Sequence, residues 1–464
     1  MIGPLTILGV VTIVAVGGVF VLRRRWTQVV LGATVAFPQT AGIVVGDNGF
    51  PLFYLAVVEV LLLGAPTILM GLARLGTPAA RPARGRLAAD LAGVALVVWA
   101  AVITIAGPRI FAGMRVFDPA LGVDSQVGNM STLEPSLGNL AQLGYLTLGV
   151  LVVLAAGRLF PVDARMLGSA LWVALVLAAV RLVAEPVWPH ELLQNMPGYS
   201  YATPERLSGT FYEPSVLGLY LVAAACFFGV RLLRGPAPRA RVSAVIALGL
   251  VAIEFVANAS GTALLGLIVV AAAGAALMLL RLLRTPRMGV SPWAVIGATG
   301  ALALGLTQLP LLYDLTVGSV ERKASSFSYL ARSAANDRSW QIFLETSGLG
   351  VGLGSHRPSS LFFLVLSCLG LVGTVLLVVL IAAALRSAAR TEPAAGWALL
   401  GVVVSGVIAV PDLSMPVIWV GIAVCVGSGF DTRLRRYSTD GSGAQLLQGP
   451  AAQVPALQRA ETVK

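Results

Sequence analysis

Long apolar runs alternate with short polar connections over most of this chain. A helix that crosses the hydrocarbon core of a bilayer needs about 20 apolar residues, with a range of about 17–25. Because several runs are short, between eleven and thirteen spans are expected. The thirteen runs that predict such helices are 3–22, 29–46, 52–72, 87–107, 140–157, 166–184, 215–230, 242–258, 262–280, 291–309, 361–383, 396–410 and 416–430.

Composition supports the same interpretation. Apolar residues make up 57% of the 464 residues and charged residues only 11%, whereas soluble domains carry about 25% charged residues. The expected fold class is therefore all-α, a polytopic transmembrane helical bundle with long extracytoplasmic loops. We expect residues 1–436 to form a single integral membrane domain. The tail 437–464, rich in Gln, Ala, Ser and Gly, is expected to be disordered.

The basic residues collect in every second connection. Together these connections hold 23 of the 32 Lys and Arg residues: 23–28, 73–86, 158–165, 231–241, 281–290, 384–395 and the tail from 431. Because Lys and Arg concentrate in cytoplasmic loops, the N-terminus is predicted to lie outside and the C-terminus in the cytoplasm. The net charge of +11 is then explained by topology, and no nucleic-acid partner is expected.

Three of the predicted outer connections are long, at 108–139, 185–214 and 310–360. The third is the longest polar interruption of the chain and contains DRSW (337–340) and GLGVGLGSHRPSS (348–360). Loops of this length are usually functional or disordered, and Trp340 and Phe343 favour an ordered, functional one. The three cysteines lie inside apolar runs and there are two histidines, so neither a disulfide framework, a metal site nor a cofactor is expected.

The outer connections also contain arginines beside glycine-rich turns. Arg206 precedes GTFYEP, Arg338 lies in DRSW, and Arg357 follows GVGLGS. A guanidinium group suits a phosphate or pyrophosphate because its planar fork donates two parallel charge-assisted hydrogen bonds. The alternative for each arginine is a position at the membrane interface without a ligand. GVGLGS itself lacks the GK[ST] ending of a P-loop, and its glycines could equally serve close helix packing.

Two residues are candidates for moving a proton. His356 is the first candidate, because histidine has a reference pKa near the operating pH. The simpler interpretation of His356 is a solvated loop histidine. Glu213 is the alternative base. Ionisable residues within spans are functional by default, and Glu59, Arg181 and Glu254 all fall in the outer halves of their predicted spans. These three predict a polar cavity that opens outward, or else an ion pair of Arg181 with Glu59 or Glu185.

Four sequence patterns occur in a characteristic order. They are R-x-x-G-T-F-x-x-P from 206 to 214, R-x-W from 338 to 340, G-V-G-x-G-S from 350 to 355, and L-x-x-L-G-L-x-G from 366 to 373. Their order and placement resemble the O-antigen ligase and Wzy-type polysaccharide polymerase superfamily. The resemblance covers about a third of the chain, 205–373.

The resemblance implies an inverting, metal-independent glycosyltransferase of the bacterial cytoplasmic membrane. Such enzymes move a glycan from undecaprenyl pyrophosphate to a sugar hydroxyl or another acceptor at the outer face, beside a flippase and a chain-length regulator. By motif, Arg206 and Arg338 match the family's pyrophosphate-binding arginines. His356 corresponds to the histidine that assists the acceptor. The residues expected to contact substrate are Tyr212, Arg357, Ser359 and Arg181.

This chain also departs from the family pattern. Ser359 stands near the place where many members have a His-Asn pair, Glu213 replaces a frequent Asn, and 258–262 lacks the usual Arg. These departures leave the acceptor and the base open. The rival function is a transporter or flippase for a lipid-linked or anionic substrate, against which we find no internal repeat and no matched pair of broken helices. A non-catalytic membrane scaffold is the third possibility.

Overall fold

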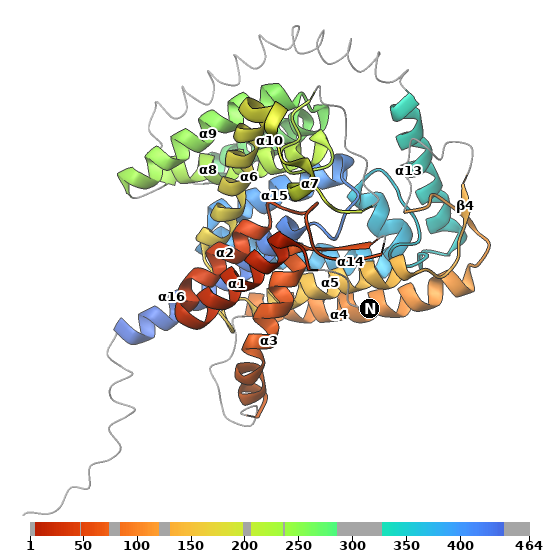
Figure 1. The fold of residues 1–464 in the computed structure, drawn as a ribbon, viewed down its shortest axis with the longest axis horizontal. Coiled ribbons are helices and arrows are strands. Elements are labelled where there is room, and N and C mark those ends of the chain that lie inside the picture. Colours follow the sequence, from red (N-terminus) through yellow and green to blue (C-terminus); the bar gives the residue numbers. More distant parts are fainter. Residues whose placement is uncertain are drawn as a thin grey trace, which may run out of the picture.

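The computed structural model of the protein describes residues 5–46, 48–73, 84–119, 130–197, 206–234, 237–284 and 327–439 (Figure 1). The described chain is a bundle of helices with two small β-hairpins, which confirms the all-α prediction. The hairpins are β1 (Ala41–Val45) with β2 (Asn48–Pro51), and β3 (Arg115–Val116) with β4 (Ser131–Thr132).

Six helices are long and apolar enough to cross a membrane, and five shorter apolar helices accompany them. The helices are α1 (Ile7–Leu22), η1 (Arg24–Trp26), α2 (Thr27–Thr34), α3 (Leu52–Ala73), α4 (Arg84–Ile110), α5 (Leu137–Ala155), α6 (Ala164–Ala184), η3 (Glu185–Val187), α7 (His190–Leu193), α8 (Pro214–Arg234), α9 (Pro238–Asn258), α10 (Gly261–Arg284), α13 (Phe327–Glu345), α14 (Leu361–Thr391), α15 (Pro393–Ala409) and α16 (Pro416–Thr439). Eleven of the predicted spans coincide with helices of this set. The predicted span 291–309 and the tail from 440 lie outside the described residues.

The prediction of a helical span over 29–46 is wrong. Helix α2 ends at Thr34, and the chain then continues without helix to β1. Pro38 explains the interruption, because proline lacks an amide donor and disfavours helix at the residue before it. Other parts of the bundle supply the missing hydrogen bonds. The Tyr220 hydroxyl donates to the Val35 carbonyl at 2.9 Å, and the Thr210 hydroxyl donates to the Ala36 carbonyl at 2.5 Å.

The bundle has two chemically different ends. At one end, which we call the arginine-rich end, Arg86 donates to the Ala156 carbonyl at 2.5 Å and Arg158 pairs with Asp90 at 2.7 Å. The opposite end, which we call the loop end, carries both hairpins and the connections 346–360 and 410–415. Helices α4 and α5 run between these ends, since Asn139 near the start of α5 contacts Leu353.

Part of the predicted outer loop 310–360 is helical. Helix α13 occupies 327–345 and stands at the edge of the bundle, beside the β3–β4 hairpin (Figure 1). Its buried side, which includes Ala331, Ala335, Ser339 and Ile342, faces the rest of the protein. The residues 346–360 that follow it form a tightly packed connection to α14.

Helix α14 is broken at Gly370, whose φ of 65° and ψ of −165° are not helical. The glycine-rich segment 348–352 completes the hydrogen bonding at this break. The Val351 and Gly352 amides donate to the carbonyls of Ser367 and Cys368, both at 2.9 Å. The Leu371 amide donates back to the Gly348 carbonyl at 2.8 Å, and the Trp99 indole donates to the Leu369 carbonyl at 2.7 Å. The glycines of this segment thus serve close packing against α14, the structural role that the sequence allows for GVGLGS.

The contact requires glycine at position 350. Its φ is +86°, and an added Cβ would lie 2.7 Å from the carbonyl group of Cys368. Gly113 provides a matched comparison, because its φ is +84° but an added Cβ would meet nothing within 4 Å. The left-handed conformation alone costs an L-residue about 1–2 kcal/mol.

Gly350→Ala is therefore predicted to destabilise the protein more than Gly113→Ala. Both variants incur the conformational cost, but only Gly350→Ala pushes the connection off the broken helix. The measurement is the apparent melting temperature of each purified variant in the same detergent. Equal shifts for the two variants would show that the contact at Gly370 contributes nothing beyond backbone conformation.

Candidate functional site

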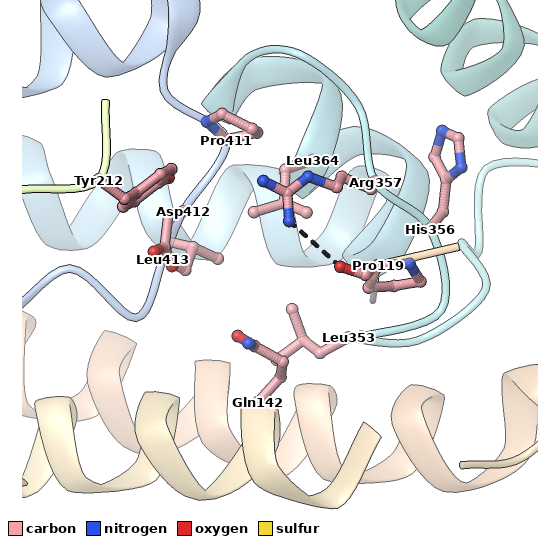
Figure 2. Close-up of a pocket in the computed structure, with 11 residues that line it drawn as sticks. Pro119, Gln142, Tyr212, Leu353, His356, Arg357, Leu364, Pro411, Asp412 and Leu413 are labelled. Atoms are coloured by element: carbon pink, nitrogen blue, oxygen red, sulfur yellow. Dashed lines mark hydrogen bonds between the residues drawn. The ribbon is translucent and has the colours of Figure 1, made fainter. Parts of the chain in front are cut away.

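A cavity of about 90 Å³ opens at the loop end (Figure 2). That volume is enough for several ordered waters or a small polar group. Its lining comes from segments that are far apart in the sequence. The lining residues with polar or bulky side chains include Gln142, Tyr212, Leu353, Arg357, Leu364 and Asp412.

Arg357 supplies the positive charge of the cavity. Its backbone amide donates to the Phe117 carbonyl at 2.9 Å, and its guanidinium donates to the Pro119 carbonyl at 3.1 Å. In Figure 2 the guanidinium points towards the middle of the cavity, with Tyr212 and Asp412 on the far side. Both Arg357 and Tyr212 were predicted to contact substrate, and the structure places both in the cavity wall.

Asp412 supplies the negative charge of the cavity, and it lies outside all four sequence patterns. It lies in the turn between α15 and α16, where its carboxylate accepts bonds from the Ser414 amide at 2.7 Å and the Ser414 hydroxyl at 2.5 Å. The Tyr54 hydroxyl holds the same turn through the Ser414 carbonyl at 2.7 Å. Burial raises the pKa of Asp412, while the bonds from Ser414 and the charge of Arg357 act in the opposite direction.

His356 borders the cavity, but both of its ring nitrogens are already used. Nδ1 accepts the Phe117 amide at 3.1 Å, and Nε2 lies 2.8 Å from the Ser339 hydroxyl. That hydroxyl donates to the Ala335 carbonyl at 2.6 Å, so its oxygen accepts the Nε2 proton. The side chain is 1% exposed, and its ring turns away from Arg357 (Figure 2).

The protonation state of His356 follows from these surroundings. Burial lowers the pKa of His356 to about 3, and the nearby positive charge of Arg338 adds to this effect. The ring is therefore neutral near pH 7, with one tautomer fixed by its two partners. In this arrangement it has no nitrogen available to accept a proton from a substrate.

Arg338 is held by an ion pair. Its guanidinium makes two bonds to the Glu345 carboxylate, at 2.7 and 3.0 Å, and a third to the Arg115 carbonyl at 2.8 Å. These bonds to Arg338 lower the pKa of Glu345. Arg338 joins α13 to β3 and does not line the cavity.

Arg206 lies on the same connection as Tyr212 but faces elsewhere. Its guanidinium donates to the carbonyls of Asn258, at 3.2 Å, and Ala259, at 2.8 Å, at the end of α9. Burial lowers the pKa of Arg206, and the positive charge of Arg332 on α13 lowers it further. Arg206 is bonded to the end of α9, and Arg338 is bonded to Glu345 and β3. Among the described residues, the predicted convergence of Arg206, Arg338 and His356 in one cavity is therefore not seen.

Two further predicted residues hold helix ends in place. The Glu213 carboxylate accepts the Ser215 hydroxyl at 2.8 Å, in the first turn of α8. The Ser359 amide and hydroxyl both donate to the Asn336 side chain, at 3.1 and 2.9 Å, which ties α13 to the start of α14. Neither Glu213 nor Ser359 is part of the cavity wall.

Arg181 is 5% exposed and fixes the connection before α8. It donates to the Ser208 hydroxyl at 2.8 Å and the Gly209 carbonyl at 2.6 Å, and it pairs with Glu185 at 3.7 Å. This is the ion pair that was the alternative to a substrate-binding role. The structure does not gather the three in-span ionisable residues into one cavity, since Glu59 faces Gly17 of α1 and Glu254 is buried in α9 without a hydrogen-bond partner among the described residues.

Among the residues that the structure describes, no three His, Cys, Asp or Glu side chains gather as metal ligands. The charged groups in the described lining of the cavity are the guanidinium of Arg357 and the carboxylate of Asp412. Such a pair can bind an anion on one side and accept a proton on the other. The two residues that sequence reasoning missed, Gln142 and Asp412, carry no motif that could have identified them.

The buried neutral state of His356 predicts a pH-dependent stability. Because the pKa is lower in the folded protein, the unfolded chain binds more protons below about pH 6.5, and stability should fall as the pH drops from 6.5 towards 3. The maximum slope for one group is about 1.4 kcal/mol per pH unit. His356→Gln should flatten this dependence, as measured by the apparent melting temperature between pH 4.5 and 7.5.

His190 provides the matched control, since its side chain is 40% exposed. His190→Gln should keep the slope of the native protein. If the slope of stability against pH is unchanged in His356→Gln, or is lost equally in both variants, the buried neutral state assigned to His356 is contradicted.

No protein-family model matches this chain, and a comparison with functionally characterised proteins finds no match. Function is therefore inferred from the cavity and from the motifs that supply its walls.

Proposed function

We propose that the protein is a membrane glycosyltransferase that moves a glycan from a polyprenyl-pyrophosphate donor to a hydroxyl acceptor. One observation carries the proposal: motifs separated by more than a hundred residues meet at a single cavity. Tyr212 comes from R-x-x-G-T-F-x-x-P, Leu353 from G-V-G-x-G-S, Arg357 from the segment after it, and Leu364 from the start of the next helix. These are the segments that resemble the O-antigen ligase and Wzy-type polymerase superfamily.

In the proposed reaction, an acceptor hydroxyl oxygen attacks the anomeric carbon of the donor sugar. The bond from that carbon to the pyrophosphate oxygen breaks, and the electron pair leaves with the pyrophosphate. Attack from the opposite face inverts the configuration. Arg357 would bind a phosphate through two parallel hydrogen bonds and stabilise the charge that develops on the leaving group.

The acceptor proton needs a base, and Asp412 fits this role better than His356 or Glu213. It borders the same cavity as Arg357, and burial raises the pKa of its carboxyl towards the pH range where a general base is most effective. The role that remains for the other predicted residues is to hold the walls of the cavity in position; these residues are His356, Arg338, Ser359 and Arg181. The charges of Arg206 and Arg332 lie close together. They form a second positively charged surface at which the donor could approach the protein.

The proposed setting is the outer face of a bacterial cytoplasmic membrane. The arginine-rich end would face the cytoplasm, in keeping with the distribution of Lys and Arg in membrane proteins. The lipid tail of the donor would then lie against the bundle, with its pyrophosphate at the loop end. A flippase that delivers the donor and a chain-length regulator are the partners that this setting implies.

A transporter or flippase is the second candidate, and one observation favours it. The membrane segment at α2 and helix α14 are both interrupted, and transporters bind substrates at interrupted helices. The carbonyls at these interruptions are, however, bonded by the chain itself. The hydroxyls of Tyr220 and Thr210 donate to the backbone carbonyls after α2. The Trp99 indole and the amides of 351–352 donate to the carbonyls at the break of α14. The breaks therefore leave few acceptors for a substrate, and we favour the enzyme.

Arg357→Lys and Asp412→Asn are each predicted to reduce glycan transfer by about 10²–10³-fold, the usual effect of removing one group from a preorganised site. Lysine keeps the charge of Arg357 but loses the planar fork, and asparagine cannot accept the proton. The measurement is transfer in vitro from a synthetic polyprenyl-pyrophosphate donor, without ATP. Arg115→Lys and Asp337→Asn, at exposed positions of the same end, are the matched controls and should retain activity.

Transfer should also rise with pH as Asp412 loses its proton, and this dependence should disappear in Asp412→Asn. If the purified protein moves a lipid-linked glycan between leaflets without changing its covalent linkage, the enzyme proposal is wrong. Full activity in Asp412→Asn would place the base elsewhere.

A further inference from the structure

A second cavity, of about 300 Å³, lies at the arginine-rich end, where the proposed reaction has no need of one. Its walls come from η1, α2, α6, α8 and α9. The lining residues that matter for recognition are Trp26, Arg165, Trp172, Phe228, Arg231 and Ser243.

Two arginines from different helices supply the charge of this cavity. Arg165, in the first turn of α6, pairs with Asp163 at 2.6 Å and keeps 55% of its side chain exposed. Arg231, in the last turn of α8, lies over the Phe227 ring at 5.4 Å. The nearby acidic groups are Asp163 and Glu392. Burial raises the pKa of Glu392, and the positive charge of Arg231 acts in the opposite direction.

The positive charge extends beyond the lining. Helix α9 begins at Pro238, and Ala240 and Ser243 of its first turns border the cavity. Arg239 and Arg241 in the same turn are exposed. The start of a helix also carries a partial positive charge. Arginines therefore outnumber acids around this cavity, and they come from three helices.

Aromatic side chains form the remaining wall. Trp172 and Phe228 meet edge to face, with ring centroids 5.5 Å apart. Trp26 is 44% exposed and also borders an open groove along α1, lined by Gly18, Val19, Leu22 and Arg23. Tryptophan favours the boundary between lipid and water, because one edge is polar and the rest apolar. An apolar surface thus leads away from the arginines along the outside of the bundle.

We propose that this cavity binds one anionic glycerophospholipid, with its phosphate between Arg165 and Arg231 and an acyl chain along Trp172 and Trp26. Charge complementarity selects the ligand, since basic pockets between membrane helices suit phosphate headgroups. The aromatic wall and the groove beyond it distinguish a lipid from a soluble phosphate. The site is separate from the proposed transfer site, because α6 and α8 each extend from one end of the bundle towards the other.

The test is binding of phosphatidylglycerol to the purified full chain, measured by native mass spectrometry with phosphatidylcholine as the competing lipid. The native protein should retain phosphatidylglycerol in preference to phosphatidylcholine. Each arginine beside an anionic headgroup is expected to change Kd about fivefold, so R165Q with R231Q should weaken binding on the order of 25-fold. R386Q with R390Q removes the same charge from exposed positions near the same end and should leave binding unchanged.

A third variant, A240W, fills the cavity without changing any charge and should also prevent binding. Glycerol 3-phosphate, which has the phosphate but no acyl chain, should not displace the lipid. The proposal is overturned if both double variants weaken binding equally, if correctly folded A240W still binds, or if glycerol 3-phosphate competes as well as the lipid does. Gel filtration and the melting temperature of each variant establish that it is folded.

Discussion

The break in α14 at Gly370 is the constraint on which the loop end depends. Within a membrane protein, a broken helix leaves carbonyl and amide groups that must find partners inside the chain, because lipid offers none. Here the partners are the amides of Val351 and Gly352 and the indole of Trp99. Each such group left unpaired would cost several kcal/mol, so the connection 348–352 has essentially one place to lie.

That fixed connection determines where the cavity forms. After Gly352 the Leu353 amide donates to the Thr104 hydroxyl at 3.0 Å, and Asn139 bonds both the Leu353 carbonyl, at 2.7 Å, and the Ser355 hydroxyl, at 2.8 Å. The chain therefore reaches Arg357 already bound to α4 and α5. Arg357 faces the cavity on a rigid support, as a preorganised electrostatic site requires.

Many polar residues at the loop end serve this support. Arg181, Arg338, His356 and Ser359 all have short bonds to backbone or side-chain partners, and these bonds join segments distant in sequence. In a low-dielectric interior such networks are strong when fully satisfied. A polar residue in a membrane protein can thus be required by the fold, even where its chemistry would also suit catalysis.

The sequence predicted most helices because apolar runs of sufficient length have few other solutions in a membrane. It failed over 29–46, where hydropathy continues but Pro38 ends the helix and distant side chains such as Tyr220 make the extended chain possible. Tyr212 and Arg357 were predicted from motifs. Asp412 could not be predicted as a site residue from the sequence. Its significance comes from facing Arg357 across a cavity, and that proximity exists only in three dimensions. The hydrogen bonds that occupy both ring nitrogens of His356 likewise depend on Phe117 and Ser339, which only the fold brings close.

The most direct measurement is a cryo-electron microscopy structure of the protein with a non-hydrolysable polyprenyl-pyrophosphate analogue bound. We expect phosphate oxygens within hydrogen-bonding distance of the Arg357 guanidinium, with the Asp412 carboxylate facing the side of the sugar opposite the leaving pyrophosphate. Pyrophosphate bound anywhere else, with Arg357 still bonded to the Pro119 carbonyl and the cavity holding no part of the donor, would contradict this expectation.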